Sequence, residues 1–468
     1  MKTPFLKIMA FGSMGLLMLV LIAATLLEKL YGTSFAIGNI YHSAWFITIW
    51  SLLAVTAMAY TLRVSRRWTL TALHASFAII LVGAFVSFMT SRHGSIVLAK
   101  EAVPASMFTT PQGELEKLPF SLQLADIDTV YSKGDRQHHD YQARITVNDK
   151  KESNTRTISL NNPLKIKGFS LCIKGVTDGH LSLFVAHDTI GLPISYAGYL
   201  MMFVSFIMLF LDKRSGFNAL LQQTRGEIKK SAKKEKDRMN LEILTRKMWA
   251  LLPCSFIFLC ILWYRRGIFP ATNGVETLML LALFVMLLAA ALRRQRHFVL
   301  LSRALIIVAA IFFAVAAGNL DGDRDVQPIL RSPLLGIHVT TIIIAYALLA
   351  CIAVNAVIAL FRKDAKRRAQ QTVLGRTLLY PATILLATGI FIGAVWANIS
   401  WGRYWGWDPK EVWALITLLC CSFAFHTRSL PFMAKPLFFH IYCIAVFVIM
   451  LFTYLGVNYL LGGMHSYM

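Results

Sequence analysis

Eleven apolar runs constrain the fold of this chain most strongly, because about 20 apolar residues in a helix cross the hydrocarbon core of a bilayer. They predict membrane spans at residues 9–27, 44–62, 69–90, 194–211, 248–264, 274–292, 299–317, 336–361, 376–396, 412–426 and 436–460. The tenth is the shortest. The chain has 468 residues, of which 56% are hydrophobic, and this excludes an ordinary soluble domain. We therefore expect a polytopic α-helical membrane protein with about eleven transmembrane helices in contact with lipid.

Basic residues are concentrated in one set of connecting segments, and the net charge is +23. The basic segments are residues 63–67, 212–247, 293–297, 362–368 and 426–428. Along the chain they alternate with connecting segments that are less basic. By the positive-inside rule, the alternation predicts a cytoplasmic N-terminus and a C-terminus on the outer side. Because topology accounts for the charge, we expect no nucleic-acid partner.

Two long segments lie outside the apolar runs. The first contains the alternating stretches SLQLADIDTV, YQARITV and LSLFVAHD, separated by turn residues, and predicts a small outside-facing β-domain between the third and fourth helices. The second is strongly charged and predicts a cytoplasmic linker. The predicted division is residues 1–90 for three helices, 91–193 for the β-domain, 194–211 for the fourth helix, 212–247 for the basic linker and 248–468 for a seven-helix domain.

The seven cysteines include no C-x-x-C pair, and only Cys172 lies outside an apolar run. This pattern gives no case for a disulfide framework, a zinc site or a thioredoxin-like pair. Any thiol chemistry is therefore expected to use thiols of a partner. The N-terminal apolar run is longer than the core of a signal peptide and lacks a small-residue cleavage site, so we expect a retained helix.

The segment WGRYWGWDPKEVW at residues 401–413 has an unusual density of aromatic residues. Flat aromatic rings suit a large planar ligand such as a porphyrin, although an interfacial aromatic belt is the alternative. Asp408, followed by proline and then Glu411, is also typical of a helix N-cap. The candidate ligand-contacting residues in and beside this segment are Trp396, Trp401, Tyr404, Trp405, Trp407, Asp408 and Trp413.

Four histidines form two candidate pairs at different depths in the membrane. His338 and His465 are expected at the outer side, on the same membrane face as the aromatic segment. His74 and His426 are expected near the inner side, one from each half of the chain. Ionisable groups at membrane depth are functional candidates, and two neutral imidazoles can hold a haem iron. Interhelical hydrogen bonding is the alternative, and His440 is the most plausible non-ligand of similar position.

Several motifs resemble a known family. GAVWANISWGRYWGWDPKEVWALIT is similar to the tryptophan-rich "WWD" segment of haem-handling proteins of cytochrome c maturation. PATNGVETL, FHTR and FTYLGVNYLLGGMHSY resemble the CcsA (ResC) branch in order and spacing. LEKLYGTSFA, LHASFAIILVGAF, NNPLKIKGFS and HDTIGLPISYAGY resemble the partner protein CcsB (ResB). The whole chain resembles a CcsB–CcsA fusion of the System II cytochrome c synthase, with a β-domain shorter than in many CcsB proteins.

The resemblance implies a haem lyase (holocytochrome c synthase) in a bacterial cytoplasmic (inner) membrane. His338 and His465 would be axial ligands of haem b at the outer site, and His74 and His426 would hold haem within the membrane. The aromatic segment would present the haem vinyl groups to the two thiols of a C-x-x-C-H segment in apocytochrome c. A separate thioredoxin-like partner would keep those thiols reduced.

Two other functions stay open from the sequence alone. A haem exporter or chaperone would hand haem on without forming the bond, and a structural membrane subunit would use the aromatic segment only as a belt. An outside domain fused to a haem site favours the synthase, because a synthase must also receive a protein substrate.

Overall fold

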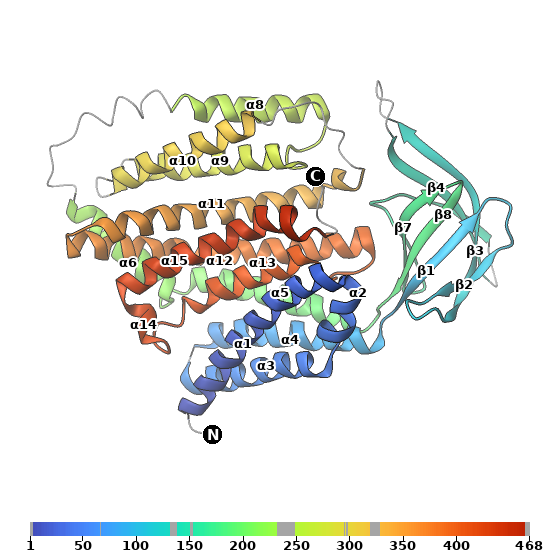
Figure 1. Ribbon diagram of the computed structural model, residues 1–468, viewed down its shortest axis with the longest axis horizontal. Coiled ribbons are helices and arrows are strands. Elements are labelled where there is room, and N and C mark those ends of the chain that lie inside the picture. The colour runs from blue at the N-terminus through green and yellow to red at the C-terminus, as the bar shows by residue number, and fades with distance from the viewer. Residues whose placement is uncertain are drawn as a thin grey trace.

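The computed structural model describes residues 3–463 apart from residues 66, 132–137, 150–152, 232–248, 294, 296–297 and 319–327. Figure 1 shows a bundle of helices with a β-domain at one end. Among the described residues, nine helices are long and apolar enough to cross a membrane. The prediction of a multi-pass membrane protein with a β-domain between its third and fourth spans is confirmed.

The first half of the chain contributes four long helices. They are α1 (Thr3–Tyr31), α3 (Ala44–Val64), α4 (Trp68–Thr90) and α5 (Gly191–Leu211). Two short elements, α2 (Thr33–Ala36) and the π-helix η1 (Ile37–Tyr41), connect α1 to α3. The helix α6 (Gly216–Ser231) follows α5 at the opposite end of the bundle from the β-domain.

The second half contributes the remaining helices. They are α8 (Leu251–Arg266), α9 (Gly274–Leu292), α10 (Val299–Ala317), η3 (Pro328–Arg331), α11 (Pro333–Phe361), α12 (Ala365–Trp401), α13 (Pro409–Phe423), α14 (Pro431–Ala434), α15 (Pro436–Leu451) and the π-helix η4 (Phe452–Leu461).

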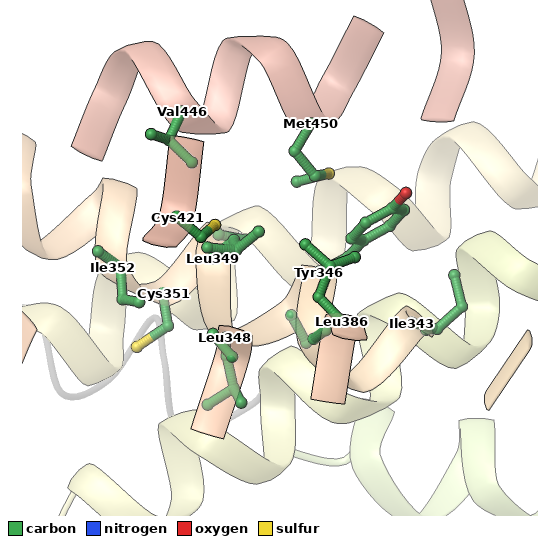
Figure 2. Close-up of a cluster of buried hydrophobic side chains, with 14 of the residues drawn as sticks. Ile343, Tyr346, Leu348, Leu349, Cys351, Ile352, Leu386, Cys421, Val446 and Met450 are labelled. Carbon is green, nitrogen blue, oxygen red and sulfur yellow. The ribbon is translucent and has the colours of Figure 1, made fainter. Parts of the chain in front are cut away.

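The fifth and tenth predicted spans form helices that are shorter than the nine spans above, of which α15 and η4 together make one. The helix α8 has 16 residues and α13 has 15, which correspond to about 24 Å or less. A bilayer core of about 30 Å is thicker than that. Figure 2 shows Cys421 of α13 among buried side chains of α11, α12 and α15. The short α13 therefore lies inside the helical bundle, where its ends need not reach both membrane surfaces.

The β-domain is one antiparallel sheet of eight strands, in the order β5-β4-β3-β2-β1-β8-β7-β6. The strands are β1 (Arg92–Ala99), β2 (Ala105–Thr109), β3 (Leu115–Tyr131), β4 (His138–Asn148), β5 (Ser153–Ile158), β6 (Leu164–Ile166), β7 (Phe169–Thr177) and β8 (His180–His187). Leu181, Leu183 and Val185 are fully buried, as the alternation in LSLFVAHD predicts. Asp178 and Gly179 both have positive φ, which suits the tight turn joining β7 to β8.

Small residues bring α4 and α5 into close contact at the β-domain end. A Cβ atom added to Gly191 would lie 2.2 Å from the backbone nitrogen of Ser87, and one added to Gly83 would lie 2.5 Å from that of Ser195. Such close backbone approach is a common way of packing membrane helices. It fixes the two helices that enter and leave the β-domain, and so fixes the position of the β-domain relative to the bundle.

Candidate functional site

The aromatic segment forms the connection between α12 and α13 at the β-domain end of the bundle. The helix α12 ends at Trp401, and Gly402 follows in the left-handed conformation with φ 75°. A Cβ atom at Gly402 would lie 2.9 Å from the ring of Phe184 and 3.3 Å from the sulfur of Cys172, both in the β-domain. Glycine is needed here for its backbone conformation and because the β-domain leaves no room for a side chain.

The predicted N-cap of α13 is confirmed. The Asp408 side chain accepts a hydrogen bond from the backbone N–H of Lys410 at 3.2 Å, and the Glu411 carboxylate accepts from the backbone N–H groups of Gly406 and Asp408. These contacts form a capping box, an arrangement worth about 1 kcal/mol. The two carboxylates therefore fix how the aromatic loop enters α13.

Trp407 is held by aromatic residues of the first half of the chain. Its ring stacks on Tyr41 with centroids 4.6 Å apart and an interplanar angle of 7°, and it meets Phe46 edge-on at 5.3 Å. Trp407 has φ 57°, a left-handed conformation that costs a bulky residue about 1–3 kcal/mol. Two aromatic contacts of about 0.5–1.5 kcal/mol each offset a strain of this size. Trp405 lies perpendicular to Trp407 at 5.8 Å.

The other tryptophans lie in separate clusters rather than in one flat surface. Trp396 is 2% exposed and packs edge-on against Trp401 at 4.8 Å. Trp413 is buried, contacts Phe452 at 4.2 Å, and donates its indole N–H to the Thr25 hydroxyl at 3.1 Å. Trp396 and Trp413 thus support the loop from within the protein, and their predicted contact with a ligand stays a prediction.

Tyr404 connects the loop to the α4–α5 junction. Its hydroxyl lies beside Ser87 and Ser195, and burial raises the pKa of this phenol above its usual range. The nearby Asp188 carboxylate accepts from the Ser87 hydroxyl and from the backbone N–H of Gly191 at 2.9 Å. The aromatic loop is therefore fastened to the first half of the chain at Tyr404 as well as at Trp407.

His338 lies on α11 with one ring nitrogen already bonded. Its Nδ1 donates to the backbone carbonyl of Gly389 on α12 at 2.7 Å, because a carbonyl can only accept. The neutral ring therefore has its lone pair on Nε2. A Cβ atom at Gly393 would lie 2.6 Å from the imidazole, so α12 leaves space for this ring only because residue 393 is glycine. His465, its predicted partner, lies outside the described residues.

His74 and His426 lie together near the end of the bundle opposite the β-domain. Their ring centroids are 6.3 Å apart and their planes are nearly perpendicular, at 83°. The Nδ1 of His74 donates to the carbonyl of Leu70 at 2.8 Å, and that of His426 donates to Ser422 at 3.1 Å. Both neutral rings therefore carry the lone pair on Nε2, as a metal-binding histidine does when its other nitrogen is fixed by a carbonyl.

His440 differs from these three histidines. It is fully buried, and its Nε2 is the nitrogen that contacts the Thr372 hydroxyl, at 2.9 Å. Its Nδ1 has no hydrogen-bond partner among the described residues. His440 makes its polar contact through Nε2, whereas His74, His338 and His426 bond to carbonyls through Nδ1. His440 therefore matches the interhelical hydrogen-bonding role.

Sequence reasoning missed the residues of the first half that contact the aromatic loop. They are Thr25, Tyr41, Phe46, Ser87 and Ser195. The only signal was their position in or near the motifs LEKLYGTSFA, LHASFAIILVGAF and HDTIGLPISYAGY.

Comparison with known proteins assigns a family to each half. The model of the ResB-like family matches residues 63–190, and that of the cytochrome C assembly protein family matches residues 272–465. The two matches together cover more than half of the chain and occur in the order of a fused protein. The chain therefore contains a ResB-like region followed by a region similar to the cytochrome C assembly protein family.

Individual relatives each match part of the chain. The cytochrome c biogenesis protein CcsA of Chlamydomonas reinhardtii is 32% identical over 229 residues, which are 45% of this chain and 64% of the relative. Protein NrfI of Wolinella succinogenes is 36% identical over 152 residues, 31% of this chain and 17% of NrfI. CcsA of Marchantia polymorpha is 51% identical over 85 residues, 18% of this chain and 26% of the relative. The chain thus spans less than two-thirds of the length of each of these relatives.

Proposed function

We propose that this chain acts in cytochrome c biogenesis as a holocytochrome c synthase. It takes haem b as a substrate, carries it from an inner to an outer site, and joins its two vinyl groups to the cysteines of a C-x-x-C-H segment in apocytochrome c. We further propose a bacterial cytoplasmic membrane as its location, with the β-domain and the aromatic loop on the outer side.

The observation that carries this proposal is the pairing of His74 with His426. Two imidazoles that bind one metal from opposite sides, with bonds of about 2 Å each, have ring centroids roughly 6 Å apart. The two rings are 6.3 Å apart, and both have Nε2 available because Nδ1 is bonded to a carbonyl. The pair joins the first half of the chain to the second, so a haem held by both rings would need both halves.

The outer site has a different role in the proposal. His338 supports haem binding there because α12 fixes its ring through the Nδ1 bond to the Gly389 carbonyl. Trp405, Trp407 and Tyr404 lie in a loop that is fastened to both halves. A loop held in this way suits a reaction that depends on orientation.

The bond-forming step is an addition without net redox change. The S–H bond of a substrate cysteine breaks, a bond from sulfur to one vinyl carbon forms, and the proton ends on the other vinyl carbon. The step needs the substrate cysteines in the reduced state, and the sequence of this chain has no C-x-x-C pair of the thioredoxin type. We therefore assign reduction of the substrate thiols to a separate thioredoxin-like partner.

The test uses the full chain purified in detergent from cells supplied with haem. We expect bound haem with histidine ligation, and loss of the inner haem in both His74→Ala and His426→Ala, with His440→Ala as the matched control. Added C-x-x-C-H peptide should then gain covalently bound haem, measured by mass spectrometry. Haem that binds but is never attached would identify an exporter or chaperone, and a colourless protein would contradict haem handling altogether.

A further inference from the structure

Tyr41 is the one residue of the first half of the chain, within its described part, that stacks face-to-face on a tryptophan of the aromatic loop. It ends the π-helix η1 and is 3% exposed. Its ring lies nearly parallel to that of Trp407, at 4.6 Å and 7°. Phe46 closes the same contact, since it meets Tyr41 at 5.7 Å and Trp407 at 5.3 Å, both edge-on. These three rings form a cluster that we call the Tyr41 clamp.

Trp407 needs such a partner because its backbone conformation is unfavourable. Its φ of 57° lies in a sparsely populated region for a non-glycine residue. Such a conformation persists only where surrounding contacts stabilise it. The capping box holds Asp408, on one side of Trp407, and the glycine turn holds Trp401, on the other. Neither contact orients the indole of Trp407, whereas Tyr41 and Phe46 contact the indole ring itself.

The stack, rather than the hydroxyl group of Tyr41, makes this contact. The Tyr41 oxygen is buried and has no hydrogen-bond partner among the described residues. Burial raises the pKa of the Tyr41 phenol above its usual range, and the nearby carboxylates of Glu28, Asp408 and Glu411 raise it further. The hydroxyl therefore stays protonated and makes no polar contact with the loop, so a phenylalanine at this position keeps every observed interaction with Trp407.

We propose that Tyr41 is a positioning residue for haem attachment, which acts by fixing the orientation of Trp407 from the first half of the chain. The inference rests on the proposed function and deepens it, since it assigns the first half of the chain a direct part in presenting the vinyl groups. Binding of haem at the inner histidine pair does not depend on this contact, because that pair lies at the opposite end of the bundle.

The first experiment needs no haem. Hydrogen exchange is measured on the full chain purified in detergent, for the wild type and for Tyr41→Leu, Tyr41→Phe and Tyr31→Leu. Tyr31 is the matched control. It is the last residue of α1 and pairs with the ring of Phe35 in α2, with ring centroids 5.0 Å apart, but it is exposed and does not contact the loop. We expect at least tenfold faster exchange at residues 403–408 in Tyr41→Leu alone. Unchanged exchange in Tyr41→Leu would overturn the proposal, even if the wild type attaches no haem.

The second experiment measures attachment of haem to a C-x-x-C-H peptide by the same variants. We expect Tyr41→Leu to lower kcat about tenfold with little change in the KM for the peptide, while Tyr41→Phe and Tyr31→Leu stay close to wild type. Trp407→Leu alone and together with Tyr41→Leu should be equally slow, because both changes remove the same contact. A fall in inner-site haem content in Tyr41→Leu, or additive effects of the two substitutions, would indicate a merely structural role and overturn the proposal.

Discussion

At one end of the helical bundle, His74 and His426 each bond to a carbonyl four residues earlier in their own segment. At the β-domain end, His338 bonds to a carbonyl of a different helix, and the aromatic loop beside it contacts the first helices and the β-domain. Each ring of the inner pair is thus oriented by a local contact, although the pair itself comes from both halves of the chain, whereas the outer site is oriented by contacts between distant parts of the chain. Under the proposed function, the comparison teaches that a site for holding haem needs two rings at the right spacing, whereas a site for orienting haem needs a surrounding framework.

The largest expected effect comes from filling the space beside His338. Gly393→Val places a branched side chain where a Cβ atom would already lie 2.6 Å from the imidazole. The ring must leave its position, so we expect outer-site haem affinity to fall about 10–100-fold, with the inner site unchanged. The absorption spectrum of the purified variant, compared with His338→Ala, measures this.

Gly336→Ala on α11 is the matched control, because its Cβ atom would meet Phe269 only at 3.7 Å. If Gly393→Val binds outer haem normally, the outer site does not depend on the close approach of α11 and α12, and the contrast between the two ends fails.

A smaller effect is expected when the loop loses its bond to α1. Thr25→Val removes the acceptor of the Trp413 indole N–H and leaves a buried donor unpaired, at a cost of about 1–3 kcal/mol. We expect a lower unfolding temperature in detergent and slower attachment, with inner haem retained. Thr48→Val is the control, since Thr48 on α3 is exposed and bonds only to its own helix. Equal behaviour of the two variants would mean that α1 does not support the loop.

At the inner end we expect Phe11→Leu to have a still smaller effect, on the rate at which haem leaves the inner site. The Phe11 ring meets His426 edge-on at 5.2 Å, a contact of about 0.5–1.5 kcal/mol. Its loss should speed release of haem from the inner site up to about tenfold, measured by transfer to a haem-binding acceptor protein, and should leave attachment at the outer site unchanged. Slower attachment in this variant would show that the two ends are coupled, contrary to the comparison.

The contact between the β-domain and the loop can be tested through pH without a large change in activity. Because burial raises the pKa of the Cys172 thiol to about 11, about one thiol in a thousand is ionised at pH 8. The thiolate is the reactive form, so we expect alkylation of Cys172 to be slow at pH 8 and to rise about tenfold per pH unit up to about pH 11. Mass spectrometry of the alkylated peptide measures the rate, with free glutathione as the reference thiol. Alkylation at pH 8 as fast as that of glutathione would show that the end of α12 and the loop do not cover this cysteine of the β-domain.

Local patterns predicted much of the fold because each depends on residues close together in the chain. Apolar runs placed the long helices, and alternation in LSLFVAHD placed β8 with its buried leucines. Asp408 and Glu411 predicted the capping box from their spacing alone. The length of α13 was harder to predict, because an apolar helix inside a bundle has the composition of a membrane span.

What the sequence by itself determined about this protein is its membrane-spanning class, its β-domain and the cap of α13, because periodicity, length and turn chemistry act over a few residues. Only the tertiary structure decided which tryptophans face one another, which nitrogen of His74, His338 and His426 bonds to a carbonyl, and that Tyr41 lies on Trp407. Those outcomes depend on how α1, η1 and α3 pack against a loop more than 350 positions away, and no local pattern records that packing.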